Sequence, residues 1–168
     1  MSAVASRRAF LTGRLSGEDD SAMWPPGAAR DNFPDLCTRC GDCVSVCPEN
    51  VLVLGARGLP VFQPQDAGCT FCGDCADVCK TEALDLARFA AWPWRARVAD
   101  TCLSLNAVSC RVCQDSCDQG AIGFRLKTGG SADPVLNEDA CIGCGACATA
   151  CPAGAISLQR AQHLEAAE

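Results

Sequence analysis

Residues 37–48 read Cys37-Thr-Arg-Cys40-Gly-Asp-Cys43-Val-Ser-Val-Cys47-Pro48, and the rest of the chain is organised around this run. Its four thiols lie within eleven residues, and a proline follows the last of them. Spacers this short allow the first three cysteines of one tight loop to turn their sulfurs inward onto one centre. Gly41 allows the backbone to wrap closely there, so that its N–H groups can point at the same centre.

The spacing C-x2-C-x2-C-x3-C-P is typical of the loops that hold [4Fe–4S] clusters in bacterial ferredoxins. In proteins with two clusters, the fourth cysteine of such a run binds the other cluster. The run at 37–48 therefore predicts an iron–sulfur protein in which cysteine runs work in pairs.

Three further runs show that the chain contains an internal duplication. The second has the spacing of the first, but Lys80 stands where the first has a proline. The fourth matches the first fully and ends in Pro152. The third has seven residues in its first gap instead of two, and Asp118 follows it. These runs occupy residues 69–79, 102–117 and 141–151.

Exchange of the fourth cysteine between neighbouring runs predicts four [4Fe–4S] sites that use all sixteen cysteines as iron ligands. The site with Cys102 depends on the stretched loop, and a labile, damaged or absent cluster is the alternative there. The predicted ligand sets are Cys37, Cys40, Cys43 and Cys79; Cys47, Cys69, Cys72 and Cys75; Cys117, Cys141, Cys144 and Cys147; and Cys102, Cys110, Cys113 and Cys151.

Zinc and disulfides explain this cysteine pattern less well. A structural zinc site combines two separated cysteine pairs, or cysteines with histidines, in one tetrahedron. Each run here would leave a third cysteine surplus, and His163 is the sole histidine of the chain. Closely spaced cysteines also make a poor disulfide framework, and a reducing cytosol keeps thiols free for metal.

The segments between the runs predict an α+β fold of tandem bacterial ferredoxin-like modules. Each is a 2[4Fe–4S] module in which short helices and small antiparallel hairpins pack on the clusters. Apolar stretches predict hairpins from 50–54 with 59–62 and from 121–126 with 134–136, and closing strands at 83–87 and 155–158. The expected organisation is an N-terminal extension and linker (1–34), a first module (35–88), a linker (89–101), and a second module with a C-terminal tail (102–168).

Aromatic residues gather outside the cysteine runs. Trp24 and Phe33 flank a proline-rich stretch that we expect to be irregular and anchored by these rings. Trp92 and Trp94 lie in the expected linker. We expect these two tryptophans to pack between the two halves or to cover a cluster, rather than to form a patch that recognises a partner.

Charge and motif content disfavour several classes of function. The net charge is −6, and bound clusters add negative charge, which disfavours nucleic-acid binding and favours basic partners. No G-x-G-x-x-G or P-loop pattern occurs, so nucleotide binding is unsupported. With every cysteine used as a ligand, no open metal site remains, and we expect an electron carrier rather than an enzyme.

The N-terminus carries Ser6-Arg7-Arg8-Ala9-Phe10-Leu11-Thr12, which looks like a twin-arginine export motif. An export signal also needs an apolar segment after the arginines, but the chain continues with Gly13, Arg14 and then mainly polar residues. No stretch approaches the length of a transmembrane helix. The sequence therefore predicts a cytoplasmic protein, with Arg7 and Arg8 as a solvated basic start or a docking element.

The chain resembles the NapF-type ferredoxins of periplasmic nitrate reductase systems in three features. These are its four cysteine runs, the seven-residue gap in the third run, and the N-terminal sequence Ser-Arg-Arg-x-Phe-Leu-Thr-Gly-Arg. The segment Cys110-Arg-Val-Cys113-Gln-Asp-Ser-Cys117 supports the resemblance. It implies a cytoplasmic, non-catalytic accessory protein that helps to mature the catalytic, molybdenum-containing reductase subunit before export, by docking or by supplying electrons. The alternative is an electron-transfer subunit that links a quinol or ferredoxin donor to an oxidoreductase.

Overall fold

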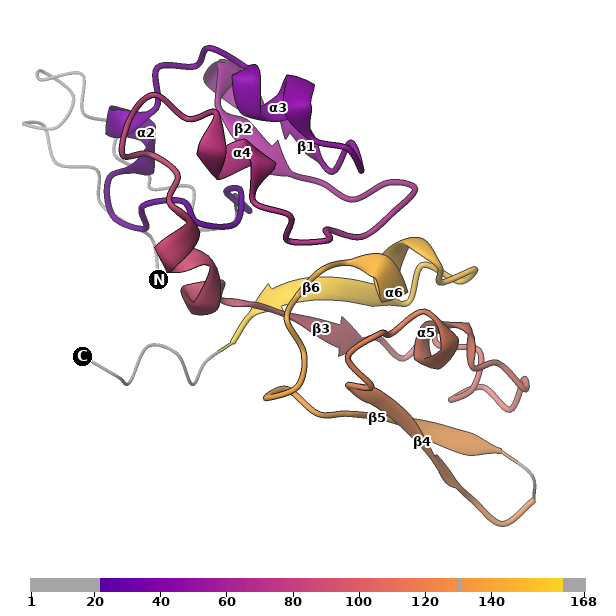
Figure 1. Cartoon of the computed structure of the whole chain (residues 1–168). Coiled ribbons are helices and arrows are strands. Elements are labelled where there is room, and N and C mark those ends of the chain that lie inside the picture. The colour runs from indigo at the N-terminus through magenta and orange to yellow at the C-terminus, as the bar shows by residue number, and fades with distance from the viewer. Residues whose placement is uncertain (1–21, 130, 162–168) are drawn as a thin grey trace, which may run out of the picture.

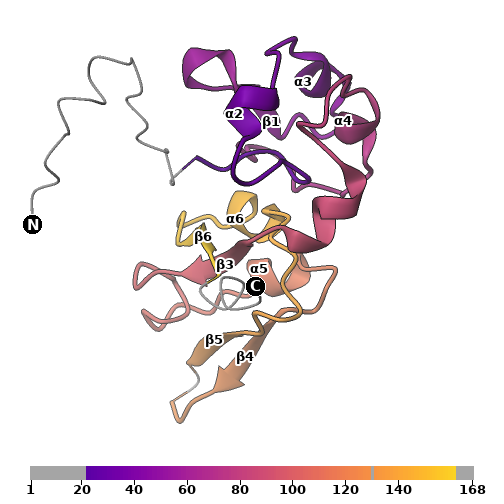
Figure 2. The ribbon, with the colours of Figure 1, turned by 90° about the vertical axis from the view of Figure 1, so that its left-hand side faces the viewer.

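The structure is a computed structural model of the chain and describes residues 22–129 and 131–161. Figures 1 and 2 show a first half that contains α2 to α4 and a second half that contains β3 to β6, with a short helix leading from one to the other. The Arg7–Arg8 segment, whose expected role was left open, and His163 lie outside the described residues.

The first half is built from short helices and one small hairpin. The helices are α2 (Phe33–Leu36), α3 (Asp42–Val46) and α4 (Asp74–Asp77). Strands β1 (Leu52–Leu54) and β2 (Pro60–Phe62) pair antiparallel, with Val53 opposite Val61. The 3-10 helix η1 (Ala56–Gly58) connects them, which confirms the first predicted hairpin.

The second half has two antiparallel strand pairs. Strand β4 (Ile122–Leu126) pairs with β5 (Ala132–Leu136), which confirms the second predicted hairpin. Strand β3 (Trp94–Val98) pairs with β6 (Ile156–Arg160), so that Ala96 faces Leu158. Helices α5 (Val112–Asp115) and α6 (Ala146–Thr149) complete this half.

Two expectations about the joining segment differ from the structure. The strand expected at 83–87 is only an isolated bridge between Leu84 and Ala28, and the 3-10 helix η2 (Leu86–Ala91) begins directly after it. The reason is local: the Asp85 carboxylate accepts a hydrogen bond from the Ala87 N–H at 2.9 Å and starts the helix. Residues 94–98, expected as linker, instead form β3 of the second half.

Left-handed glycines start the helices that follow three of the four cysteine loops. Gly41, Gly73 and Gly145 precede α3, α4 and α6 with φ between 81° and 97°, a region that costs other L-residues about 1–2 kcal/mol. In the third run, Arg111 holds the equivalent place before α5 with φ −139°, so the loop there follows a different path.

The described residues form two hydrophobic cores, one centred in each half. The first contains Phe33, Val51 and Phe62, and also Trp92 and Trp94 from the joining segment. The Phe62 and Trp92 rings meet edge to face at 5.3 Å. Trp92 and Trp94 therefore pack against the first half, whereas β3, which begins at Trp94, pairs with β6 of the second half.

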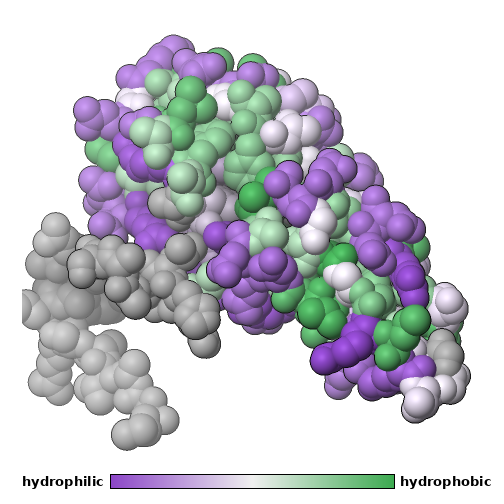
Figure 3. Space-filling model, turned by 60° about the horizontal axis from the view of Figure 1, so that its bottom comes forward, coloured by the Kyte–Doolittle hydropathy of each residue, from purple (hydrophilic) through white to green (hydrophobic). Residues whose placement is uncertain are grey.

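The second core is small and lies beside cysteines. It contains Ala96, Ile122, Cys147 and Ile156. Large apolar side chains such as Leu126 remain exposed on the β4–β5 hairpin, and Figure 3 shows hydrophobic and hydrophilic residues interleaved there, at its lower right. Among the helices in the described part of the chain, none is long and apolar enough to cross a membrane.

Candidate iron–sulfur sites

The structure brings the sixteen cysteines together in four groups, and each group lines its own cavity. Each cavity has about 340–380 Å³ of empty space. The groups coincide with the four sets that the sequence predicts. They are Cys37, Cys40, Cys43 and Cys79; Cys47, Cys69, Cys72 and Cys75; Cys117, Cys141, Cys144 and Cys147; and Cys102, Cys110, Cys113 and Cys151.

The residues around each cavity fit a [4Fe–4S] cluster. Four thiols and mainly apolar side chains line each space, the donor set and dry surroundings that a cubane takes. Within residues 22–129 and 131–161, no three cysteine, histidine or acidic side chains converge on a position for one metal ion. A zinc ion would need thiolates about 2.3 Å from one centre, so the cysteine groups suit a larger group better.

Although the first gap of the third run is longer, Cys102 lies beside the cysteines that were predicted to share its site. The Asn106 side-chain amide donates hydrogen bonds to the carbonyls of Asp100 and Cys102, at 2.7 and 2.9 Å. The buried Ser104 hydroxyl donates to the Ala132 carbonyl of β5. The additional residues thus form a turn tied to the hairpin, and Cys102 lies at the same cavity as Cys110.

Backbone N–H groups point at several of the cysteine sulfurs. The N–H groups of Phe71, Ala121 and Ala155 each lie with their nitrogen 3.3 Å from a cysteine sulfur. Such hydrogen bonds stabilise negative charge on sulfur and raise the reduction potential of a cluster. Cys69, Cys117 and Cys151 are the acceptors.

Burial raises the pKa of several thiols, and the neighbouring cysteines of the same group raise it further. The pKa values of Cys43 and Cys69 rise to about 11. Those of Cys75 and Cys147 rise to about 12. These thiols are protonated at neutral pH when no cluster is bound, so binding a cluster must release their protons.

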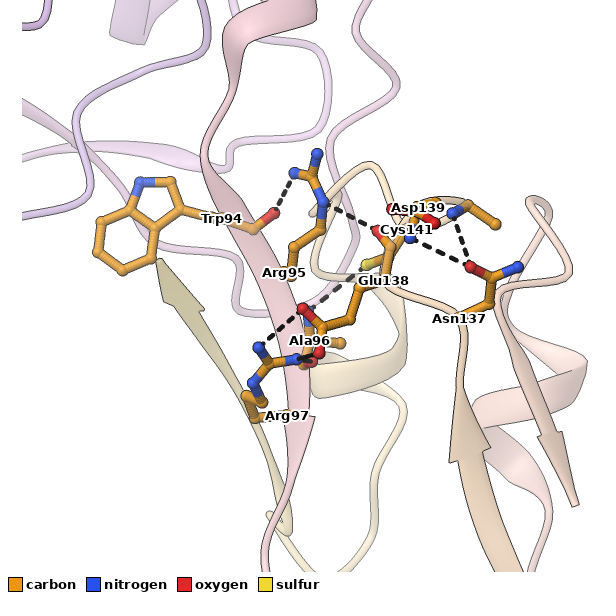
Figure 4. A network of polar contacts seen from close by, with 9 residues as sticks. Trp94, Arg95, Ala96, Arg97, Asn137, Glu138, Asp139 and Cys141 are labelled. Carbon is orange, nitrogen blue, oxygen red and sulfur yellow. Dashed lines mark hydrogen bonds and ion pairs between the residues drawn. The ribbon is translucent and has the colours of Figure 1, made fainter. Parts of the chain in front are cut away.

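A polar network holds the loop that carries Cys141 against β3 (Figure 4). The Arg97 guanidinium pairs with the Glu138 carboxylate at 2.7 Å, and Arg95 Nε donates to the Glu138 carbonyl at 3.1 Å. The Ala96 N–H points at the Cys141 sulfur, with its nitrogen 3.5 Å away.

The sequence pattern did not predict these positioning residues. Asn137 offers a local signal, because its side-chain oxygen accepts from the N–H groups of Asp139 and Ala140 as in an Asx-turn. Arg95 and Arg97 have no local signal in the sequence, because their role depends on the pairing of β3 with the distant strand β6.

The second and fourth cysteine runs touch each other between the two halves. The Cys69 N–H donates to the Cys144 carbonyl at 2.7 Å, and the Trp92 indole N–H donates to the Gly143 carbonyl at 3.3 Å. A side chain at Gly143 has no space, because its Cβ would overlap the Trp94 carbonyl oxygen. Two of the four cysteine groups are therefore neighbours across the junction.

Comparison with known proteins assigns the cysteine runs to two iron–sulfur domains. The sequence profile of the 4Fe-4S dicluster domain matches residues 36–83 and again residues 108–155. The ferredoxin-type protein NapF of Haemophilus influenzae is 43% identical over 163 residues, which cover 90% of this chain and 92% of that protein. The chain belongs to the NapF-type ferredoxin family.

Other relatives extend the comparison. The ferredoxin-type protein NapF of Escherichia coli K12 is 39% identical over 155 residues, covering 92% of this chain and 94% of that protein. The ferredoxin-type protein NapG of the same organism is 35% identical over 166 residues, covering 83% of this chain and 69% of that protein. This NapF-type ferredoxin thus has two dicluster domains whose sixteen cysteines are consistent with up to four [4Fe–4S] clusters.

Proposed function

We propose that the sixteen cysteines of this ferredoxin hold four [4Fe–4S] clusters in the crossed sets given above. The observation that carries the proposal is the agreement between the four cavities and the four sets expected from cysteine spacing. When bound, the clusters supply one-electron transfer. The cysteines bind them, the apolar side chains around them exclude water, and the N–H groups at the sulfurs adjust their potentials.

The two dicluster domains correspond in this proposal to one module around residues 35–88 and a second that extends to the C-terminal tail. The second includes β3, because the pairing of β3 with β6 ties residues 94–98 to it. The tryptophan segment and the contact between Cys69 and Cys144 join the modules.

The function favoured for this protein is that of a cytoplasmic accessory and maturation factor for the catalytic subunit of periplasmic nitrate reductase before its export. Similarity to NapF over about nine-tenths of the chain supports this choice. In this role the protein would dock on the precursor and transfer electrons to it. It would have no substrate site of its own.

A pull-down tests this function directly. The full chain, purified anaerobically, is used to capture the reductase precursor with its export signal. The same experiment is repeated with Cys43→Ser, which removes a buried ligand, and with Ser45→Ala as the control from the same helix. Capture by the wild-type and control proteins supports the docking role, and failure of all three proteins to capture the precursor contradicts it.

A second candidate is an electron-transfer subunit between a quinol or ferredoxin donor and an oxidoreductase. The hydrogen bond between Cys69 and Cys144 favours it, because neighbouring sites are what electron passage between two modules needs. The two candidates differ in their dependence on the clusters. Capture of the precursor that survives Cys43→Ser favours an assembly factor, whereas reduction of the protein by a quinol analogue favours an electron-transfer subunit.

A further inference from the structure

The third cysteine run differs from the other runs at a second place besides its longer gap. In the other three runs a left-handed glycine follows the second cysteine, namely Gly41, Gly73 or Gly145. In the third run this place belongs to Arg111, whose φ is −139°. The four cysteine sets by themselves give this arginine no role.

Two of the three glycine loops are covered by a side chain from another segment. A Cβ at Gly73 would lie 2.6 Å from the Leu86 side chain, and a Cβ at Gly145 would lie 2.7 Å from that of Pro64. Apolar neighbours therefore pack on these loops where a side chain would otherwise begin. The loop of the third run instead has a long side chain of its own, which reaches a neighbouring element.

Arg111 connects this loop to strand β4. Its guanidinium carbon lies over the ring of Phe124, 5.6 Å from the ring centre. A guanidinium in this position is attracted by the negative face of the ring. The Arg111 carbonyl accepts hydrogen bonds from the N–H groups of Gln114 and Asp115, at 2.9 and 3.3 Å, so the first turn of α5 fixes the backbone from which the side chain extends.

The ring under Arg111 belongs to the wall of a cysteine cavity. Phe124 lines the cavity of the set that contains Cys102 and Cys110, and every other side chain of that lining is a cysteine or apolar. Phe124 is only half-buried, whereas Arg111 is exposed. The guanidinium therefore covers, on the solvent side, part of the apolar wall that keeps this cavity dry. Solvent access is one of the properties that a protein controls around a metal site.

We propose that Arg111 is a positioning residue for the set that contains Cys102: its guanidinium holds the Phe124 ring in the cavity wall and thereby limits access of solvent to a cluster bound there. The inference rests on the four-cluster assignment proposed above. It adds the residue through which the run that lacks the left-handed glycine closes its site.

Release of iron from the anaerobically purified, cluster-loaded full chain tests this inference. The probe is the ferrous chelator bathophenanthroline disulfonate, followed by absorbance. In Arg111→Gln we expect about one-quarter of the iron to leave roughly two- to fivefold faster than in the wild-type protein, as loss of an exposed cation–π contact predicts, with the rest unchanged. Arg111→Lys keeps a cation over the ring, so it should restore most of the wild-type rate.

Two further variants separate this contact from a general effect of charge. Arg125→Gln removes the same charge from the residue next to Phe124, but successive residues of a strand point to opposite faces, so the release rate should not change. Phe124→Leu removes the ring. When Arg111→Gln is added to Phe124→Leu it should give no further acceleration, because the contact is already lost.

Three results would overturn the role of Arg111: release from Arg111→Gln at the wild-type rate, equal acceleration by Arg125→Gln, or release from Arg111→Lys as fast as from Arg111→Gln. If Phe124→Leu loses the cluster outright, these single variants still decide. A wild-type protein with only about twelve iron contradicts the four-cluster assignment itself. A wild-type protein with about sixteen iron and unchanged release from Arg111→Gln contradicts the role of Arg111 alone.

Discussion

At the scale of single residues, Thr81 distinguishes one cysteine group from the others. Its hydroxyl lies 3.7 Å from the Cys79 sulfur. Burial raises the pKa of Cys79, but hydrogen bonds from the Thr81 N–H and hydroxyl and from the N–H groups of Leu84 and Ala83 outweigh it, so the pKa is lowered. These hydrogen bonds stabilise the thiolate of Cys79, which burial alone would destabilise.

Thr81→Val should therefore lower the reduction potential of the cluster held with Cys79. Loss of one hydrogen bond to charged sulfur is worth about 1 kcal/mol, which corresponds to about 40 mV for one electron. An EPR-monitored redox titration measures the change. Thr149→Val is the control, because the Thr149 hydroxyl bonds to the Ala146 carbonyl instead. An unchanged potential in Thr81→Val would show that the hydroxyl does not act on the cluster.

The raised pKa values give a direction for the effect of pH on cluster retention. Without a cluster, the thiols of Cys75 and Cys147 titrate near 12, and they are thiolates in the cluster-bound state. Protons therefore compete with iron at every pH below that value. Release of iron to a chelator should be faster at pH 6 than at pH 8, and a faster release at pH 8 would contradict this assignment.

At the scale of elements, the loop around Gly143 is the tightest point of the junction between the halves. Gly143 has φ +72°, and its place against Trp92 and Trp94 leaves no space for a side chain. Gly120 has a similar φ of +60°, but nothing lies within 4 Å of the position that its Cβ would take. A comparison of substitutions at these two glycines therefore distinguishes the cost of backbone strain from the cost of a steric clash.

Gly143→Ala should destabilise the protein by at least about 3 kcal/mol, because the junction must open to admit a methyl group. Gly120→Ala should cost only the left-handed strain, about 1–2 kcal/mol. Anaerobic urea denaturation, followed by loss of cluster absorbance, gives both values. Equal destabilisation by the two substitutions would mean that the junction is not closely packed in solution.

Local signals predicted the hairpins but not the strand order of the second half. Apolar runs around turns identified β1–β2 and β4–β5, because neighbouring strands leave their pattern in one short segment. The pairing of β3 with β6 joins residues about sixty positions apart and has no such signal. The expected strand at 83–87 was wrong because the Asp85 side chain caps a helix there.

At the scale of the whole molecule, the cysteine grouping was the most predictable feature. The exchange of fourth cysteines that is typical of two-cluster ferredoxins led to four predicted sets, and the cysteines of each set line one cavity in the structure. The contacts that position the cysteine loops were not predictable. Arg97 lies on β3, and its ion pair with Glu138 depends on where β3 packs in the fold.

The central claim is that the protein carries four [4Fe–4S] clusters, each held by one crossed set of cysteines. Iron and acid-labile sulfide determination, combined with EPR on the anaerobically purified full chain, tests it most directly. We expect about sixteen iron and sixteen sulfide per chain, with cubane signals on reduction. Iron well below about twelve per chain, with zinc in its place, would contradict it.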